Sequence, residues 1–325
     1  MEADNRQSIA VQAQAEVPAE LDGSRLDRAA AQLFNDYSRE RLKAWISSGE
    51  LTVNGQAAGR PRDPVNAGDV LRIDASLAVT DDVQAQPIEL ALLYEDEDIA
   101  VINKPAGLTV HPGAGQADST MQNALLHRYP ALAQVPRAGI VHRLDKDTSG
   151  LLVVALNLAS HTHLVRTLQA REIKREYDAI VHGCPTGGGT VDAPIGRHPT
   201  RRTRMAVVGD GRPSVTHYRV AERFAHHTHL AVQLETGRTH QIRVHMQHLR
   251  YPMVGDPVYG TRSVRGAGLS DALRSQVQRF GRQALHARRL TLAQPRTGET
   301  LSFEAPLPDD MRELIAALRA ESVSG

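Results

Sequence analysis

The chain has 325 residues, of which 23% are charged, and it contains one cysteine, Cys184. This length allows two domains with a sizeable core. No apolar run approaches the ~18 residues that a membrane span needs, and the polar N-terminus lacks the apolar segment of a secretory signal. A lone cysteine excludes an internal disulfide and a cysteine-based zinc site. The composition therefore predicts a cytoplasmic protein that does not bind membranes.

The net charge of +1 conceals an uneven distribution along the chain. Residues 25–62 carry seven basic and four acidic side chains, and residues 104–325 carry 29 basic and 18 acidic ones. Residues 1–24 and 63–103 are acidic. A locally basic surface attracts polyanions even when the whole chain is nearly neutral. Ordinary solvated charge explains the same pattern equally well at this point.

Residues 1–20 lack an apolar period, so we expect a disordered tail there. A small unit at residues 21–75 follows. Ser24 is placed to cap a first helix, whose apolar face has helical spacing: Leu26, Ala29, Ala30, Leu33 and Phe34. Ser38 is placed to cap a second helix over 38–48, which Gly49 ends. Short strands at 51–53 and 70–73, with a tight turn at 54–55, complete the unit.

The polar faces of these two helices carry five cations: Arg25, Arg28, Arg39, Arg41 and Lys43. Helices that present arginines suit phosphate contact, because a guanidinium offers paired donors. Over its whole length the unit resembles the small RNA-binding module named after ribosomal protein S-four. The resemblance implies that these five residues contact RNA, with the second helix forming most of the RNA-binding face.

Residues 76–88 have no apolar period and are expected to form a linker. From residue 89 the sequence changes to short strands, at 99–102, 151–156, 177–181, 215–220 and 228–234, with helices at 120–127, 160–169 and 270–280. This predicts one mixed, mainly antiparallel α+β domain over 89–319, with a tail at 320–325. Three glycines at 187–189 predict a hairpin turn, since no phosphate-loop lysine follows them.

The most informative stretch is GIVHRLDKDTSG at 139–150, which apolar residues follow. A charged loop here runs directly into a buried strand. That arrangement holds a loop carboxylate rigidly against the edge of a core, where catalytic groups are commonly placed. From the residues alone, Asp145 beside Arg143 and Lys146 fits a solvated turn as well.

Four ordered blocks of sequence resemble the RluA family of pseudouridine synthases, most closely its RluD group. They are INKPAGLTVHPG at 102–113, HRLDKDTSGLL at 142–152, KREY at 174–177, and LETGRTHQIRVHM at 234–246 with GDPVYG at 255–260. Together with the N-terminal unit, the resemblance spans roughly 21–315. It implies the α+β pseudouridine synthase fold, a mixed and mainly antiparallel sheet flanked by helices and loops. Loops at 116–119 and 262–268 look variable within the group, which leaves the choice of target uridine open.

By matching position, Asp145 is the catalytic aspartate, Tyr177 packs against the target base, and Arg243 pairs with the aspartate. The reaction breaks the bond from ribose to uracil N1, turns the base and rejoins it through C5, so no cofactor is expected. A carboxylate can serve as nucleophile or base, and a neighbouring arginine favours its charged form. A tyrosine offers a flat face and a hydroxyl that can handle a proton. Without the resemblance, Tyr177 and Arg243 would be ordinary structural residues.

The target base must leave its stack to reach a loop carboxylate. The resemblance makes Arg143 the residue that fills the vacated space, while His142 is expected to make a structural hydrogen bond. A basic cluster containing Arg201, Arg202 and Arg204 is interpreted as an RNA-contacting arm near the site. A plain solvated loop is its alternative.

No metal site is expected. The histidine groups at 226–229 and 240–248 lack a metal-ligand spacing, and the acidic run at 95–98 lacks the glycine of a calcium loop. The resemblance implies an enzyme that isomerises specific uridines in 23S large-subunit ribosomal RNA. We expect a monomer, although no feature of the sequence excludes a dimer. Two alternatives remain open: a non-catalytic RNA-binding or ribosome-assembly factor, and a glycosidase-like enzyme that cleaves the nucleoside bond without rejoining it.

Overall fold

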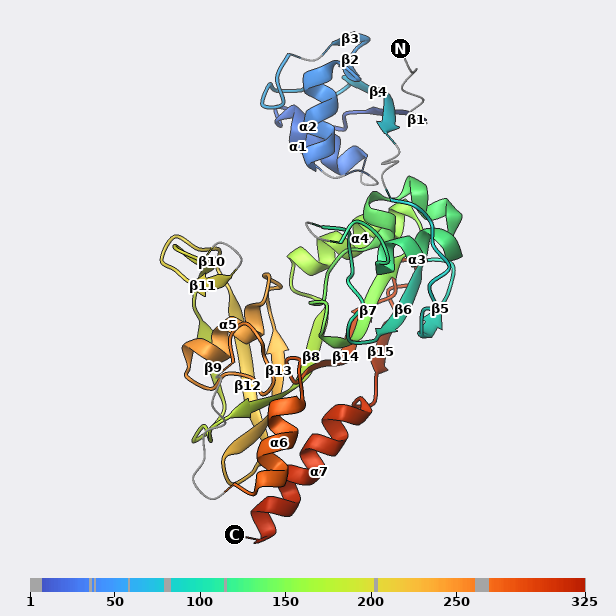
Figure 1. Cartoon of the computed structure of the whole chain (residues 1–325). Coiled ribbons are helices and arrows are strands. Elements are labelled where there is room, and N and C mark those ends of the chain that lie inside the picture. The colour runs from blue at the N-terminus through green and yellow to red at the C-terminus, as the bar shows by residue number, and fades with distance from the viewer. Residues whose placement is uncertain are drawn as a thin grey trace.

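The computed structural model describes residues 8–34, 37, 39–57, 59–78, 83–113, 116–201, 204–260 and 269–324. They form an N-terminal module and a larger domain, each with its own hydrophobic core (Figure 1). The module contains β1 (Ser8–Glu16), η1 (Ala19–Leu21), α1 (Leu26–Leu33), α2 (Arg39–Ser48), β2 (Leu51–Val53), β3 (Gln56–Ala57) and β4 (Val70–Ala78). Its described strands form a sheet in the order β1-β4-β2-β3.

Strand β1 lies in the segment that was expected to be a disordered tail, so that prediction is wrong for residues 8–16. The strand pairs antiparallel with β4 along its whole length, from Ser8 opposite Ala78 to Glu16 opposite Val70. Its alternating small residues give a weak apolar signal. Val11 is buried in the module's core and Ala13 and Ala15 pack against it, so the alternation has a physical role. Because β4 continues to Ala78, the expected linker also begins later than residue 76.

The expected helices of the module are present, with one difference at a cap. Leu26, Ala29 and Ala30 on α1 face the core as predicted. The residue before α1 is Arg25, and no side chain caps it, so Ser24 is not the N-cap. Ser38, the expected cap of α2, lies outside the described residues. Gly49 ends α2 with φ +80°, as predicted.

The larger domain is built on one long sheet, which confirms the α+β class. Its elements are β5 (Leu92–Glu95), β6 (Ile99–Lys104), α3 (Met121–Arg128), η2 (Pro130–Gln134), η3 (Pro136–Gly139), β7 (Ser149–Ala155), α4 (Leu158–Gln169), β8 (Lys174–His182), β9 (Gly189–Asp192), β10 (Ile195–Arg197), β11 (Met205–Val207), β12 (Val215–Arg223), β13 (His227–Leu234), α5 (Gln241–His248), α6 (Asp271–Arg279), β14 (Leu285–Ala293), β15 (Thr300–Glu304) and α7 (Asp309–Ser324).

The sheet follows the order β5-β6-β7-β14-β8-β13-β12-β9, and β15 pairs with β14. Only the β7–β14 pair is parallel among its described ladders. Glycines 187–189 do not form the expected hairpin turn, because β8 pairs with β13 and β14 whereas β9 pairs with β12. Helix α7 continues to Ser324, so residues 320–324 are helical and not a tail.

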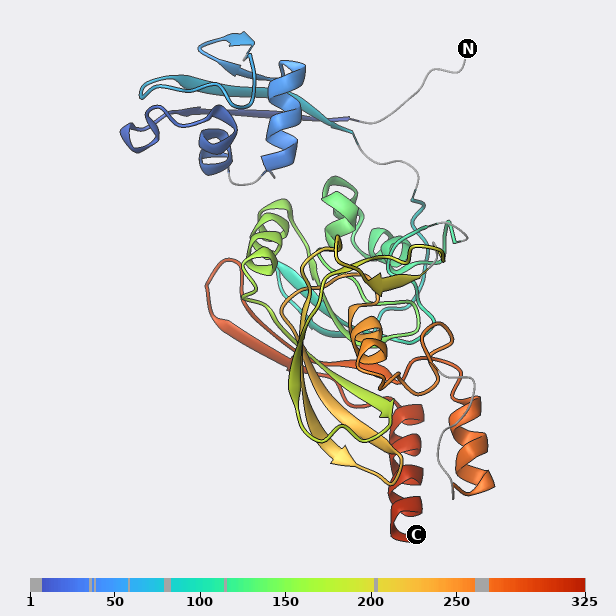
Figure 2. The ribbon, with the colours of Figure 1, turned by 90° about the vertical axis from the view of Figure 1, so that its left-hand side faces the viewer.

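Both faces of the sheet are covered near β6 and β7, which explains why β7 is buried at every position. Ile102 and Leu152 join one hydrophobic core, and Val101 and Val153 join a second on the opposite face, which Leu164 of α4 completes. Helices α6 and α7 pack side by side at the far end of the domain from the N-terminal module (Figure 2).

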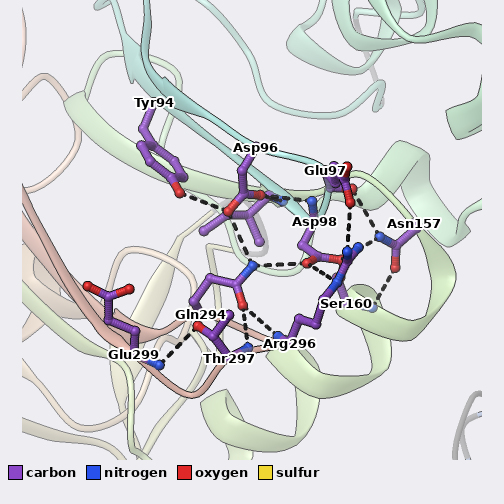
Figure 3. Close-up of polar contacts among 11 residues, drawn as sticks. Tyr94, Asp96, Glu97, Asp98, Asn157, Ser160, Gln294, Arg296, Thr297 and Glu299 are labelled. Atoms are coloured by element: carbon purple, nitrogen blue, oxygen red, sulfur yellow. Dashed lines mark hydrogen bonds and ion pairs between the residues drawn. The ribbon is translucent and has the colours of Figure 1, made fainter.

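A polar network fastens the β14–β15 turn to the start of β6 and to α4 (Figure 3). Asp98 accepts hydrogen bonds from Asn157, Ser160 and Gln294, and its carboxylate lies 3.0 Å from the guanidinium of Arg296. Burial opposes the ionisation of Asp98, but these donors lower its pKa overall. The network therefore holds the β14–β15 turn, the start of β6 and the start of α4 together.

Candidate active site

A cavity of about 500 Å³ opens where the loop before β7, strand β8 and the connection from β13 to α5 meet. Its lining includes Arg143, Asp145, Tyr177 and Arg243, so the four residues expected at the site share one cavity. Arg243 is 98 residues from Asp145 in sequence, yet its Nη1 donates a hydrogen bond to Asp145 Oδ2 at 2.9 Å. The Asp145 side chain is 15% exposed and thus remains accessible from the cavity.

Lys104 fixes the loop that carries Asp145 by a hydrogen bond to the carbonyl of the next residue, Lys146. Lys104 is fully buried, and its Nζ donates hydrogen bonds to the carbonyls of Pro105, Leu108 and Lys146 at 2.8, 2.9 and 2.8 Å. Burial lowers the pKa of Lys104 to about 7, although the negative charges of Asp147 and Asp145 act to raise it. Lys104 belongs to a block that carried the resemblance, but its tethering role was not predicted.

Arg243 is itself held by a second carboxylate, that of Asp256. Its Nε and Nη2 donate to the two oxygens of Asp256 at 2.7 and 2.9 Å, which leaves Nη1 for Asp145. Burial lowers the pKa of Arg243, but Asp256 and Asp145 raise it above its usual value overall. Asp256 also accepts the backbone N–H groups of Val258 and Tyr259. Because Asp256 holds the Arg243 guanidinium through two hydrogen bonds, the guanidinium cannot rotate away from Asp145 and can keep that carboxylate in one orientation.

Tyr177 forms part of the cavity wall from β8. Its side chain is buried, and burial raises the pKa of its hydroxyl, with Arg175 opposing and Asp145 adding to the effect. The ring is therefore neutral at physiological pH and gives an apolar surface beside the Asp145 carboxylate.

His240 was not assigned from the sequence, although its ring lies near Asp145. Its Nε2 is 4.0 Å from Asp145 Oδ1, and its Nδ1 lies 2.8 Å from the hydroxyl of Tyr259. That hydroxyl accepts the N–H of Met205, so it can donate its own proton to Nδ1. With the Tyr259 hydroxyl as the donor to Nδ1, the ring proton of neutral His240 lies on Nε2, on the side of Asp145. Burial lowers the pKa of His240 and favours this neutral form.

His142 has the structural hydrogen bond that was expected of it. Its Nε2 accepts the backbone N–H of Val153 at 3.1 Å, and burial lowers its pKa to about 3. The ring thus stays neutral and joins the Asp145 loop to strand β7.

Comparison with known proteins agrees with this geometry. Residues 98–248 match the family model described as RNA pseudouridylate synthase, and residues 24–71 match the S4 domain. The chain is 57% identical to "Ribosomal large subunit pseudouridine synthase D" of Pseudomonas aeruginosa, over 96% of this chain and 97% of that one. It is 54% identical to the protein of the same name from Escherichia coli K12, over 92% of each chain. The chain belongs to the RNA pseudouridylate synthases.

Solved structures give the same family. The chain resembles "Human RNA Pseudouridylate Synthase Domain Containing 4" with a TM-score of 0.55 and 26% identity, covering 70% of this chain and 93% of that one. The corresponding values for "Human RNA Pseudouridylate Synthase Domain Containing 1" are 0.53, 28%, 73% and 97%. The resemblance to the RluD group, predicted from four sequence blocks, is confirmed by the 57% and 54% identities to the two proteins named ribosomal large subunit pseudouridine synthase D.

The cations expected to contact RNA differ in their exposure to solvent and in whether they form ion pairs within this synthase. Arg143 is exposed at the cavity, and the structure gives it no ion pair among the described residues. The arm between β10 and β11 exposes Arg201 and partly exposes Arg204. It is anchored beside the site, since Met205 contacts Tyr259. Arg202 lies outside the described residues.

In the N-terminal module of the synthase, at least three of the five cations already have a protein partner. Arg25 and Arg39 both donate to the fully buried carboxylate of Asp27, with shortest distances of 3.1 and 2.8 Å. Lys43 pairs with exposed Glu40. Arg28 is exposed, and Arg41 is half-buried.

The described residues contain no cluster of three or more His, Cys, Asp or Glu that could hold a metal ion. Within that same part of the chain, no helix is long and apolar enough to cross a membrane. One histidine of each group instead makes local hydrogen bonds. His229 bonds to Asp178, and His245 bonds to Thr216 and to the carbonyl of Ala193.

Proposed function

We propose that this synthase isomerises specific uridines of large-subunit ribosomal RNA to pseudouridine, with Asp145 as the catalytic residue. The observation that carries the proposal is the ion pair of Asp145 with Arg243, itself held by Asp256, on the wall of a cavity that Tyr177 also lines. The names of the two relatives, which cover nearly the whole chain, support the ribosomal substrate. Ribosome assembly would place the enzyme in the cytoplasm.

The reaction begins with extrusion of a uridine into the cavity. Unstacking costs a few kcal/mol and least in a loop, and exposed Arg143 is the side chain positioned to occupy the space the base leaves. The base then lies against the Tyr177 ring, and the ribose faces Asp145. Because Arg243 fixes the carboxylate, the attacking oxygen needs little rearrangement before reaction.

Asp145 then acts on the sugar as a nucleophile or as a base. The bond from C1′ to N1 breaks, the uracil turns within the cavity, C5 bonds to C1′, the C5 proton leaves, and N1 gains a proton. The carboxylate is regenerated at the end. Exposed cations of the N-terminal module and of the β10–β11 arm, including Arg28 and Arg201, supply the positive surface that a folded RNA requires. We propose that one chain acts alone as a monomer.

The direct test is Asp145→Asn, which preserves shape but removes the anionic oxygen. We expect pseudouridine formation on a large-subunit RNA transcript to be abolished while the Kd for that RNA stays within about twofold. Retained turnover would show that Asp145 is not the catalytic group. Expression of the same variant in a strain lacking the synthase separates catalysis from an assembly role, because an assembly factor would restore growth without modification. Release of free uracil by the wild-type protein would favour a glycosidase.

A further inference from the structure

Arg175 is a buried cation in the cavity wall that the mechanism above does not use. It lies on β8, two residues before Tyr177, and the residue is 7% exposed. Arg175 pairs with Leu234 of β13 and Tyr177 with Val232, so the two side chains lie on the same face of the strand. Both line the cavity that contains Asp145.

The guanidinium of Arg175 lacks a full set of partners. It has five N–H donors, yet within the described residues it makes one hydrogen bond, from Nη2 to the carbonyl of Glu235 at 3.2 Å. Its Nε is buried without a partner there. The nearby carboxylate of Glu235 is already occupied by Arg171 and His217.

Other buried arginines of the same domain are compensated differently. Arg243 pairs with Asp145 and Asp256, and Arg282 pairs with Asp310 at 2.6 Å. Arg175 has no ion pair with a described carboxylate. An uncompensated buried charge is strongly unfavourable unless something else meets it. A buried donor without a partner, next to a reaction cavity, therefore points to a negative charge supplied from within the cavity.

The backbone beside Arg175 is shaped around its guanidinium. Gly237, which also lines the cavity, lies so close that a Cβ there would be 2.7 Å from Arg175 Nη1. A larger residue at 237 would push the guanidinium out of its place between the Glu235 carbonyl and the cavity. The glycine thus allows this particular position of the cation.

We propose that Arg175 is a catalytic residue that stabilises the negative charge of the detached uracil; this rests on the proposed function. When the C1′–N1 bond breaks, its electron pair stays on the base and spreads from N1 to O2 and O4. The base then turns, C5 donates a pair to C1′, the C5 proton leaves, and N1 gains a proton. A fixed guanidinium lowers the barrier to the first step because the negative charge on the base develops only in the transition state. The guanidinium therefore stabilises the transition state more than the bound uridine.

The position of Arg175 favours the base over a backbone phosphate as its ligand. Arg137 and Arg143 are exposed at the cavity and make no ion pair within the described residues, so they already offer phosphate contacts. Arg175 is instead buried beside the Tyr177 ring. The proximity of its charge to the Tyr177 hydroxyl is consistent with this, since it opposes the rise in the pKa of that tyrosine.

The test compares Arg175→Met and Arg175→Lys with a control, Arg289→Gln. Arg289 is a partly exposed arginine on β14 that pairs with Glu304 away from the cavity. With enzyme saturating over a ribosomal RNA fragment, we expect the single-turnover rate of Arg175→Met to fall by about 10²–10³-fold, the loss typical of one oxyanion donor. Arg175→Lys, which keeps the charge but not the fork, should be intermediate, and Arg289→Gln should match the wild type.

Two further measurements separate catalysis from other roles. The Kd for RNA and its dependence on salt should be unchanged in Arg175→Met, because a lost phosphate contact would lower the salt slope by about one. Millimolar guanidinium should partly restore the rate of Arg175→Ala but not of Asp145→Asn. A merely structural loss would not be restored in this way.

An undiminished rate in Arg175→Met would overturn the inference, as would a flatter salt slope with a normal saturated rate. The inference would also be overturned if Arg175→Ala were unfolded and its low rate were not restored by guanidinium. Arg175 would then be a structural residue. Each of these results requires a working wild-type enzyme. Absence of pseudouridine from the wild type would instead reject the proposed function.

Discussion

Asp256 is the residue whose replacement tests most directly how the site is held together. The structure makes it the anchor of Arg243, through two hydrogen bonds of 2.7 and 2.9 Å in which both side chains are nearly inaccessible to solvent. In Asp256→Asn, one carboxylate oxygen becomes an NH₂ group that faces an N–H donor of Arg243. The variant removes one charge-assisted hydrogen bond and leaves Asp145 as the main counter-ion of the arginine.

Removing one partner of a buried pair costs about 3–5 kcal/mol. We expect a value near 3 kcal/mol, because the asparagine keeps one acceptor for Arg243. For a domain of this size the melting temperature should fall by roughly 6–12 °C. The catalytic effect should be larger than the stability effect suggests. Arg243 is no longer held at two points, and a displacement of about 1 Å at Asp145 can lower the rate about 10²-fold.

The assay is thermal unfolding together with single-turnover pseudouridine formation at a temperature where the variant is folded. The matched control is Glu222→Gln, which disrupts another two-point pair, with Arg319 at 2.7 Å, on the surface far from the cavity. Exposed pairs contribute about 0–1 kcal/mol, so this control should keep both its melting temperature and its rate. If Asp256→Asn turned over like the control while remaining folded, Asp256 could not be the group that positions Arg243.

Two further predictions concern stability. Burial lowers the pKa of His227 to about 4, and neither ring nitrogen has a hydrogen-bond partner among the described residues. The unfolded chain, with a histidine pKa of about 6.5, therefore takes up this proton first as pH falls, so folding stability decreases from pH 6.5 towards 4. At pH 5 the wild type loses about 2 kcal/mol of folding stability through this histidine, and His227→Phe should not show that loss. An equal decrease in melting temperature from pH 7 to pH 5 in the variant and the wild type would contradict this. Gly150→Ala should destabilise the fold by roughly 3 kcal/mol and reduce activity, because φ is +110° and the new Cβ would lie 2.2 Å from the carbonyl oxygen of Ala287. Gly298→Ala, with φ +74° and open space around it, is the control for backbone strain alone, and equal destabilisation of the two variants in denaturant would show that the close approach of β7 and β14 is unimportant.

The central residues of the site could be predicted because they lie within recognisable blocks of sequence. Asp145, Tyr177 and Arg243 were placed by resemblance, and the structure brings them to one cavity. The groups that support them could not be predicted in the same way. Asp256 and Lys104 also lie in matched blocks, but nothing local indicates that one is the anchor of Arg243 or that the other is fully buried beneath Asp145. Those properties arise only when distant segments pack.

Regular elements show the same division between local and long-range information. Five strands (β6, β7, β8, β12 and β13) and three helices (α3, α4 and α6) of the larger domain were located from the sequence, whereas β14, β15, α5 and α7 were not. Strand β1 has alternating residues that are mostly alanine and glutamine, so its signal is weak until β4 supplies nine paired positions. The glycines at 187–189 were misassigned because a turn can be recognised locally, but the identity of the strands on either side of it cannot.

The parallel contact between β7 and β14 explains why a sheet of otherwise antiparallel strands can build this site. The chain enters β7 directly from the Asp145 loop, and Gly150 lies against the backbone of Ala287 at the only described parallel ladder of the sheet. On its other side, β14 pairs with β8, with Ala287 opposite Tyr177. Asp145, in the loop that leads into β7, and Tyr177, on β8, are thus positioned by two strands that share β14 as a common neighbour. Arg243 comes from α5, outside the sheet, and the carboxylate of Asp256 holds its guanidinium in place beside Asp145.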